Sequence, residues 1–573
     1  MRLRLPLSII MTPVLAGITA CVLVFASAKG HAAEKGSVVL TGLDAADIQR
    51  LGQRMYREGL LPDGSSLRGT IRGDVPVDST VFSCSNCHGQ SGLGSIEGQV
   101  ASPPVNGKGL FNPRYLYKDH IKNVISQSKG VPRTAQPIRS AYTDESLGNA
   151  IRGGVNPDGR ELLPIMPRYD LEDRDIKVLT SYLRSLSSEY SPGATDTTLH
   201  LATIITEDVS AADREAMLSP LETMVAINKQ TKTQQKLPQF AKMFRMLDRV
   251  YFRDITLAKW ELNGPSETWR VQLEEYYRRE PVFAILGGIS GGSWKPIHDF
   301  CEERRIPCLF PITDLPVISE TSWYTFYASK GFYQEGETAA RFLAGKEALP
   351  TGGKVLQIVR SGREPEALAS GFNDAWKEVG AGELETIRLA PDQLLSTREL
   401  KALLQQHQPA TVVLWAGPDV IATLEAVAAE PALPDFIVSS RYLGKAISTL
   451  PEEVREKTYI TYPYRLPEDE KIFAGYANVL SSGRQKHKDE KRIASRSFSM
   501  VHMFLQGLKE LRLDFYRDTL IDVLSMRPDQ YLPDFERYSF GLGQRYASKG
   551  CYIVQLSKGP DALLIKKSDW VVF

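Results

Sequence analysis

Two cysteines and a histidine stand close together in the stretch Cys84-Ser85-Asn86-Cys87-His88. Two thiols at this spacing can each add to one vinyl group of a porphyrin, because one turn of chain reaches both. The next residue then lies under the iron, where His88 can donate a ring nitrogen as the proximal ligand. A structural zinc site would need a second pair of Cys or His ligands, and the sequence has none at that spacing. The motif therefore predicts one covalently attached haem c.

The iron of such a haem needs a sixth ligand, and methionine is the usual partner of histidine in electron-carrying cytochromes. Met166 lies between Pro164 and Pro167, and prolines stiffen a loop without using backbone donors. Met55 lies at a core position of a helix predicted over residues 45–57. We therefore expect Met166 to bind the iron, with His120 as the alternative sixth ligand.

Residues 34–190 resemble the class I bacterial cytochromes c, in particular the small modules that accompany periplasmic dehydrogenases. The resemblance is carried by four stretches, which are Cys84–His88, Ala141–Leu147, Gly153–Arg160 and Met166–Tyr169. It implies a compact all-α domain around one low-spin haem with His/Met ligation. It also implies a redox partner protein, either a periplasmic dehydrogenase or an oxidase.

The N-terminus has the charge and size pattern of a secretory signal. Two arginines precede an apolar run from Leu5 to Phe25, and small residues follow up to Ala28 and Ala33. We predict a signal peptide over residues 1–33 and a periplasmic protein. Two alternatives stay open, because the run is long enough to remain as a membrane anchor and Ile18–Cys21 resembles a weak lipoprotein box. The protein would associate with the membrane only if the segment is uncleaved or lipidated.

Length and charge bound the remaining possibilities. A chain of 573 residues is too long for one core, so about three or four lobes are expected. The formal net charge is +1, which gives no indication of nucleic-acid binding.

A polar stretch rich in small residues, from Ser187 to Thr198, predicts a boundary with a linker at 191–198. Strands alternate with helices after it. The predicted strands are 199–205, 255–262, 282–286, 306–310, 355–359, 411–415 and 436–438, and the clearest helices are 211–228, 267–279 and 294–303. Residues 199–573 are therefore predicted to form two α/β lobes with parallel sheets flanked by helices.

The apolar strand 282–286 runs into a glycine-rich loop, Gly287–Ser293. Ligands of parallel sheets bind beyond the carboxyl ends of the strands, and the amides at the start of the next helix are expected to be available for an anion. The loop does not follow the glycine spacing of a dinucleotide site, and it lacks the Lys-Ser/Thr pair of a phosphate loop. A nucleotide ligand is not expected.

The order of these segments resembles the type I periplasmic binding proteins, especially the receptors for branched-chain amino acids. The resemblance is carried by Val282–Ser293, Ile306–Pro311 and Trp323–Ala340. It implies two lobes that close on a small ligand. The positions that match the family's ligand contacts are Ser290, Thr313, Tyr324 and Tyr327. No acidic partner for an amino group can be assigned, and the aromatic residues at 323–327 have an alternative role as core between the lobes.

The remaining cysteines and one charged run need simpler interpretations. Cys301 and Cys308 could form a disulfide in an exported chain, although sequence does not give the geometry, and Cys551 is expected to be a buried thiol. The mixed-sign run Arg484–Arg492 is predicted to be a solvated loop.

Two functions remain, and neither is that of an enzyme. The main prediction is a periplasmic mono-haem cytochrome that carries electrons. The alternative is a small-solute receptor with a redox-sensing cytochrome module. A haem enzyme such as a peroxidase requires an open sixth position, which Met166 would fill.

Overall fold

The computed structural model describes residues 44–71, 75–97, 99–114, 138–235, 253–345, 353–379, 382–430, 432–469, 488–511, 514–541 and 543–572. The predicted signal peptide and His120 lie outside these residues. The elements described below all belong to one compact unit, Ala45–Phe573. None of the described helices has both the length and the apolarity that a membrane crossing requires.

Residues 45–189, called here the first module, are built on two packed helices, α1 (Ala45–Glu58) and α6 (Asp173–Ser185). The predicted helix at 45–57 is thereby confirmed. Leu51, Met55 and Tyr56 of α1 are buried. Shorter helices complete the module, namely α2 (Cys84–His88), α3 (Gly107–Leu110) and α5 (Asp144–Gly153).

The prediction that this module is all-α is wrong in one respect, because it also contains short strands. An antiparallel sheet has the order β2-β1-β5, and a separate hairpin joins β3 to β4. Their bounds are β1 (Arg68–Ile71), β2 (Val75–Asp78), β3 (Ser95–Glu97), β4 (Val100–Ser102) and β5 (Arg168–Tyr169). The strands are two to four residues long and mostly exposed, so they lack the apolar alternation that identifies a strand in a sequence.

Residues 198–573 form two α/β lobes, as predicted. The sheet of the first lobe is parallel and has the order β10-β9-β8-β6-β7. Its strands are β6 (Thr198–Thr206), β7 (Asp254–Leu262), β8 (Ala284–Leu286), β9 (Cys308–Leu309) and β10 (Thr325–Phe326). Residues 191–198, predicted to be a linker, contact this lobe, since Ser191 N donates to Phe515 O at 3.3 Å.

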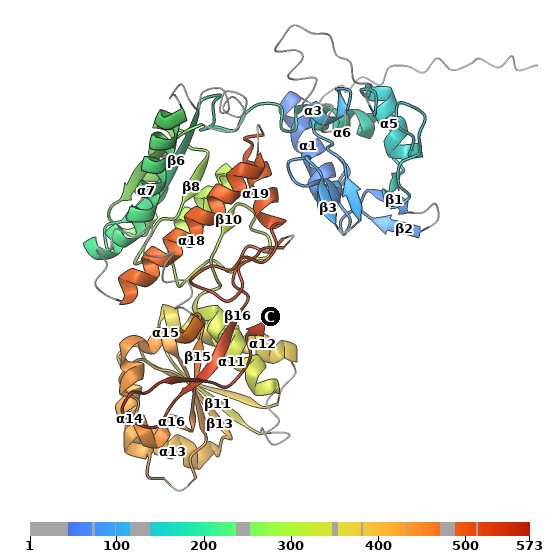
Figure 1. Ribbon diagram of the computed structural model, residues 1–573. Coiled ribbons are helices and arrows are strands. Elements are labelled where there is room, and N and C mark those ends of the chain that lie inside the picture. The colour runs from blue at the N-terminus through green and yellow to red at the C-terminus, as the bar shows by residue number, and fades with distance from the viewer. Residues whose placement is uncertain are drawn as a thin grey trace, which may run out of the picture. The chain divides into compact units, whose positions relative to one another are not determined.

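Helices bury both faces of the first-lobe sheet. One core lies between the sheet and α7, α18 and α19, and the other lies between the sheet and α9 and α10; α7 and α18 run side by side (Figure 1). The bounds are α7 (Ala211–Gln235), η1 (Ser266–Thr268), α9 (Trp269–Arg279), α10 (Lys295–Arg304), α18 (Lys488–Leu511) and α19 (Arg517–Ser525).

The second lobe has an eight-stranded sheet of order β12-β11-β13-β14-β15-β16-β17, with β18 paired to β16. The strands from β12 to β15 are parallel, and β16 to β18 are antiparallel additions. The bounds are β11 (Val355–Arg360), β12 (Leu384–Leu389), β13 (Thr411–Trp415), β14 (Asp435–Ser439), β15 (Thr458–Tyr462), β16 (Gly550–Leu556), β17 (Leu564–Lys566) and β18 (Val571–Val572).

Alternate residues of its central strands pack on opposite faces. Leu356 and Val412 belong to one core, with α13, α14 and α16, while Val355 and Val413 belong to the other, with α11 and α12. A strand buried on both faces is apolar throughout, which is why these segments are visible in the sequence. The bounds are α11 (Phe332–Gly345), α12 (Arg363–Val379), α13 (Thr397–His407), α14 (Val420–Val427), α15 (Ser440–Leu443), η2 (Gly444–Thr449) and α16 (Glu452–Arg455).

The chain passes between the two lobes three times, after β10, after β15 and before β16. The second lobe therefore interrupts the first, and α18 and α19 return to the first lobe from the far end of the sequence (Figure 1).

Close packing of α11 on α12 requires two glycines. A Cβ at Gly371 would lie 2.0 Å from the carbonyl oxygen of Tyr333, and one at Gly336 would lie 2.0 Å from that of Leu368. Both obstacles are backbone atoms, so a side chain could be accommodated only if the helices moved apart.

We expect Gly371→Ala to destabilise the chain by about 1–3 kcal/mol, because an overpacked contact forces backbone shifts of this cost. Thermal unfolding of the purified protein measures the change. Gly345→Ala is the matched control, since a Cβ there meets nothing within 4 Å, and it should leave the melting temperature unchanged or raise it. Equal melting temperatures for the two variants would contradict the packing explanation.

Candidate functional site

A cleft of about 960 Å³ lies between the two lobes. Its walls are loops that follow the carboxyl ends of β6, β8 and β9 in the first lobe and of β11, β14 and β15 in the second, together with α18. This is the position at which parallel sheets bind ligands. The charged residues that line it are Asp208, Asp213, Asp314, Glu364, Arg441, Lys445, Arg492 and Arg496.

The glycine loop after β8 forms part of the first-lobe wall, but two of its amides are not available for an anion. Gly292 N donates to Ser290 Oγ at 3.0 Å, and Gly291 N donates to Asp208 Oδ1 at 3.3 Å. Two amides of the loop are thus occupied by groups of the chain itself, and the carboxylate of Asp208 beside them disfavours an anion at this end of the loop.

The four ligand positions predicted from the family resemblance separate into two pairs. Ser290 and Thr313 line the cleft. Tyr324 and Tyr327 do not, since both are buried in the cores of the first lobe, on opposite faces of its sheet.

Each of these two tyrosines has a partner inside the first lobe or next to it. The hydroxyl of Tyr324 donates to Asp518 Oδ1 at 2.7 Å, and that of Tyr327 lies 2.9 Å from His298 Nδ1. The physical reason is the pairing of β10 with β9, which makes residues 325 and 326 an edge strand and directs the side chains around it into the two cores. The alternative interpretation of these aromatics as core is correct, although the core belongs to one lobe.

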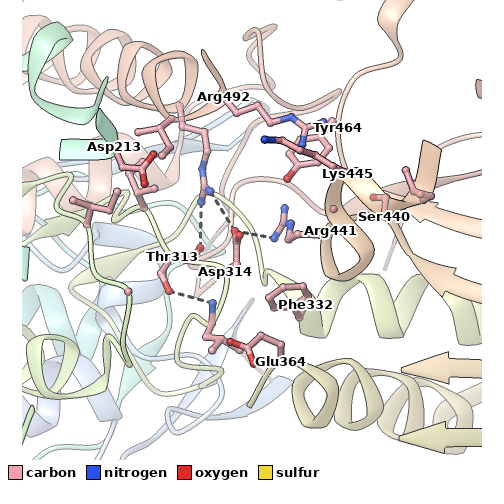
Figure 2. A pocket seen from close by; sticks show the side chains of 18 of the residues that line it. Asp213, Thr313, Asp314, Phe332, Glu364, Ser440, Arg441, Lys445, Tyr464 and Arg492 are labelled. Atoms are coloured by element: carbon pink, nitrogen blue, oxygen red, sulfur yellow. Dashed lines mark hydrogen bonds and ion pairs between the residues drawn. The ribbon is translucent and has the colours of Figure 1, made fainter. Parts of the chain in front are cut away.

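Charged groups that the sequence did not single out meet in the cleft. Arg441 Nη1 lies 3.0 Å from Asp314 Oδ1, and Arg496 Nη1 lies 3.2 Å from the same oxygen; Figure 2 shows Asp314 facing Arg441. The two arginines hold the pKa of Asp314 below its ordinary value, against the effect of its burial. Arg441 follows β14, and Arg496 lies on α18.

Arg492 corrects the interpretation of the charged run 484–492. Residues 488–492 begin helix α18, and the Arg492 guanidinium lies 4.0 Å from the centre of the Tyr464 ring on the cleft wall. Residues 484–487 lie outside the described part of the chain. A mixed-sign run looks the same in sequence whether its helix faces solvent or a cleft, so no local signal could have identified Arg492.

A second candidate site lies in the first module, on the single turn of α2. His88 is buried, and its Nδ1 donates to the carbonyl oxygen of Pro103 at 2.8 Å. A carbonyl accepts only, so the proton is on Nδ1 and the lone pair of Nε2 is free for a metal. Burial lowers the pKa of His88, which keeps the ring neutral. Cys84 and Cys87 lie on the same turn without a disulfide between them, and burial raises the pKa of Cys84 to about 11.

The loop that contains Met166 is held rigidly and reaches the cysteine motif. Arg168 donates from Nη1 to Met166 O at 2.6 Å and from Nη2 to Leu162 O at 3.0 Å. Tyr169, three residues after Met166, interacts with the thiol of Cys84, which contributes to raising the pKa of Tyr169. The loop thus lies next to the turn that carries the predicted haem attachment.

The first module leaves an unusual amount of apolar surface uncovered. Ile96 is 77% exposed, and eight other large apolar residues of the module are also exposed, namely Val75, Val81, Phe82, Val100, Ile138, Val155, Leu163 and Ile165. The remaining described residues of the chain, which are far more numerous, contribute eight such side chains. The first module thus contributes more than half of the exposed large apolar side chains among the described residues.

The other cysteines among the described residues are buried thiols. Cys301 and Cys308 are adjacent, because the thiol of Cys308 interacts with that of Cys301 and, together with burial, raises its pKa. The structure has no disulfide between them. Cys551 is buried in β16, as predicted. Within the described ranges, no group of three His, Cys, Asp or Glu residues could hold a metal ion.

Comparison with known proteins gives one family. A sequence model of the family described as "Periplasmic binding protein" matches residues 253–560, which is more than half of the chain. No curated protein sequence matches the chain. Residues 44–252 lie outside the family match, so the first module is not tested by it.

Solved structures give distant similarities. A fatty acid ABC transporter substrate-binding protein from Thermomonospora curvata is 14% identical, with a TM-score of 0.43, over 67% of this chain and 95% of that one. A putative branched-chain amino acid ABC transporter from Rhodospirillum rubrum is 13% identical, with a TM-score of 0.46, over 66% and 100%. A branched chain amino acid ABC transporter from Thermus thermophilus, with bound valine, is 11% identical, with a TM-score of 0.43, over 66% and 97%.

The family match supports the alternative prediction, a solute receptor, over the main prediction of an electron carrier. It supports a binding protein rather than an enzyme. The family also supports the predicted periplasmic location.

The buried carboxyl group of Asp534, which contacts α18, predicts a pH dependence of the stability of the fold. Asp534 accepts a hydrogen bond from Ser499 Oγ at 2.7 Å, and burial raises its pKa to about 6, from an ordinary value of 3.8. The folded chain therefore binds this proton more tightly than the unfolded chain. The stabilisation is complete below about pH 4 and is lost as the pH rises through 6.

We expect Asp534→Asn to weaken the dependence of unfolding free energy on pH between 4 and 7.5, by roughly 1–3 kcal/mol over that range. Urea titrations at several pH values measure it. Asp522, whose pKa burial also raises to about 6, should maintain part of the dependence in the variant. Asp561→Asn, at an exposed position, is the control, and a variant profile that matches the wild-type profile would contradict the assignment.

Proposed function

We propose that this chain, which belongs to the periplasmic binding protein family, binds a small organic solute in the cleft between its two lobes. The observation that supports this most is the cleft itself, whose volume of about 960 Å³ is in the range of small-molecule sites. Hydroxyl, carboxylate and guanidinium groups from both lobes line it.

The topology suits capture by closure. The two lobes are joined by three passages of the chain, and hinged lobes of this kind close around a ligand by changing a few backbone angles. Ser290 and Thr313 would contact the solute from the first lobe, and Arg441 and Tyr464 from the second.

A screen of periplasmic solutes by thermal shift should identify ligands that raise the melting temperature, because a ligand that binds only the folded state stabilises it. For such a ligand we expect Ser290→Ala and Thr313→Ala each to weaken binding about 3- to 30-fold, as the loss of one hydrogen bond does. Isothermal titration calorimetry measures it.

Tyr327→Phe is the matched control, since its hydroxyl contacts His298 outside the cleft, and it should leave affinity unchanged. If Tyr327→Phe weakens binding and the two cleft variants do not, the solute binds elsewhere. A screen in which no solute raises the melting temperature would remove the proposal.

A second proposed function concerns the first module, which we propose carries one haem c on Cys84 and Cys87. His88 and Met166 would bind the iron. The hydrogen bond from His88 Nδ1 to Pro103 favours this, since it leaves Nε2 available and orients the ring. The porphyrin of a bound haem would cover exposed apolar side chains of the module.

When bound, the haem would supply a one-electron redox centre. The chain's own residues would hold the ring in place, exclude water with the apolar surface and keep His88 neutral. A periplasmic dehydrogenase or oxidase would be the redox partner. The two proposed functions are compatible, since they use different parts of the chain.

Expression with the haem c maturation system should give a protein that stains for haem on a denaturing gel and shows c-type bands when reduced. We expect Cys84→Ala/Cys87→Ala to abolish the stain and Met166→Ala to change the spectrum from low spin to high spin, because the iron loses its sixth ligand. Met526→Ala, at a position 51% exposed in another part of the chain, is the control. Covalent haem in the double variant would refute the attachment site, and an unchanged spectrum would refute Met166.

A further inference from the structure

Arg441 is almost completely enclosed by the second-lobe wall of the cleft, and its side chain is only 5% exposed. Its position directly after β14 places it at the carboxyl end of a central strand. A buried guanidinium carries five N–H donors, and each one left without an acceptor is costly.

The donors of Arg441 are not satisfied by the chain. None of its three guanidinium nitrogens makes a well-aligned hydrogen bond with a described residue, although the group interacts electrostatically with Asp314, Tyr464 and Glu335. The nearest carboxylate oxygens are Asp314 Oδ1, 3.0 Å from Nη1, and Glu335 Oε1, 3.6 Å from Nε. The hydroxyl of the neighbouring Ser440, which also lines the cleft, is buried and has no hydrogen-bond partner in the described structure.

The cleft lining as a whole has four acidic and four basic side chains, but beside Arg441 the guanidinium groups outnumber the carboxylates that contact them. Asp314 shares one oxygen between Arg441 and Arg496. Glu335 is fully buried, and burial raises its pKa, while Ser439 Oγ and Thr461 Oγ donate to its other oxygen at 2.7 and 2.6 Å. Arg492 of α18 adds a third guanidinium to the same part of the cleft. The local carboxylates therefore do not balance three guanidinium groups.

Aromatic rings flank the guanidinium. The Cζ of Arg441 lies 5.4 Å from the centre of the Tyr464 ring and 5.8 Å from that of Phe332, and Figure 2 shows both rings beside it. The guanidinium of Arg492 lies 4.0 Å from the centre of the same Tyr464 ring. An organic ligand with an apolar body and one acidic group would find complementary surfaces here.

We infer that Arg441 binds the acidic group of the solute, so that the cleft takes organic acids, as carboxylates or similar planar oxyanions. This inference rests on the proposed solute-binding function. A carboxylate accepts two parallel hydrogen bonds from a guanidinium, and it would satisfy the donors that the chain leaves open, including the Ser440 hydroxyl.

One competing role for Arg441 is purely structural. Its ion pair with Asp314 joins the second lobe to the first, so it could serve only to hold the lobes together. The two roles make opposite predictions for Asp314. If the pair is only a link, losing either partner has the same effect. If Arg441 binds an anion, removing the Asp314 charge removes a competitor for the guanidinium.

The test measures the affinity of the full-length protein for acids and for their neutral amides. Benzoate is paired with benzamide and hexanoate with hexanamide, and calorimetry gives the dissociation constants. The wild type should prefer the acid of at least one pair by about 10- to 100-fold, the usual value of a hydrogen bond to a charged group. Arg441→Gln should abolish this preference, so that acid and amide bind with about equal affinity. Asp314→Asn should preserve or increase the preference.

Arg441→Gln leaves Glu335 without its cation, and the variant could fail to fold for that reason. Arg441→Gln/Glu335→Gln removes both charges and keeps the polar shape, so it provides the second measurement. The amide of each pair reports whether the cleft itself is intact, since its binding does not depend on charge.

Each possible result of these measurements either supports the inference or overturns it. Loss of acid preference in the arginine variants, with its retention in Asp314→Asn, supports the inference. An equal loss in all variants, or a preference that survives in Arg441→Gln, overturns it. The inference also falls if wild-type protein prefers neither acid while neutral solutes of the thermal-shift screen bind, and in that case the proposed function stands. If no solute binds at all, the proposed function fails and this inference fails with it.

Discussion

One carboxylate oxygen connects the two lobes at the cleft. Asp314 Oδ1 accepts contacts from Arg441 in the second lobe and from Arg496 on α18 in the first. The side chains of Arg441 and Arg496 are only 5% and 10% exposed. Because a buried charge is tolerated only with a partner, both arginines depend on Asp314. Since the three side chains come from three separate segments, the charged wall exists only when both lobes are folded and correctly spaced.

The same constraint explains the contrast between the cleft and the cores beside it. Both faces of each sheet are covered by helices, and the central strands carry apolar side chains in both directions. Charged groups therefore gather at the ends of the strands and in the loops that follow them, while a buried polar residue within a strand, such as Gln357, is hydrogen-bonded inside the core. At the carboxyl ends, these loops from both sheets line one cavity, which is why hydroxyls and charges of both lobes meet there.

Much of the fold was predictable, and the limits have identifiable causes. The strand at 411–415 and the helix at 45–57 were found at or within one residue of their bounds, because their apolar patterns are local. The short strands of the first module were missed, since β5 has only two residues. Tyr324 and Tyr327 were assigned to the cleft by resemblance, but the pairing of β10 with β9 buries them in the first lobe.

The sequence alone determined the apolar strands, the amphipathic helices and the presence of a Cys-x-x-Cys-His turn, because periodicity and short spacing are properties of neighbouring residues. Ser290 and Thr313 were identified through the family resemblance, and the structure places both on the cleft wall. Only the tertiary structure brought Asp314, Arg441 and Arg496 together. Ion pairing depends on distances of a few ångströms between groups that lie far apart in the chain, and no local pattern records those distances.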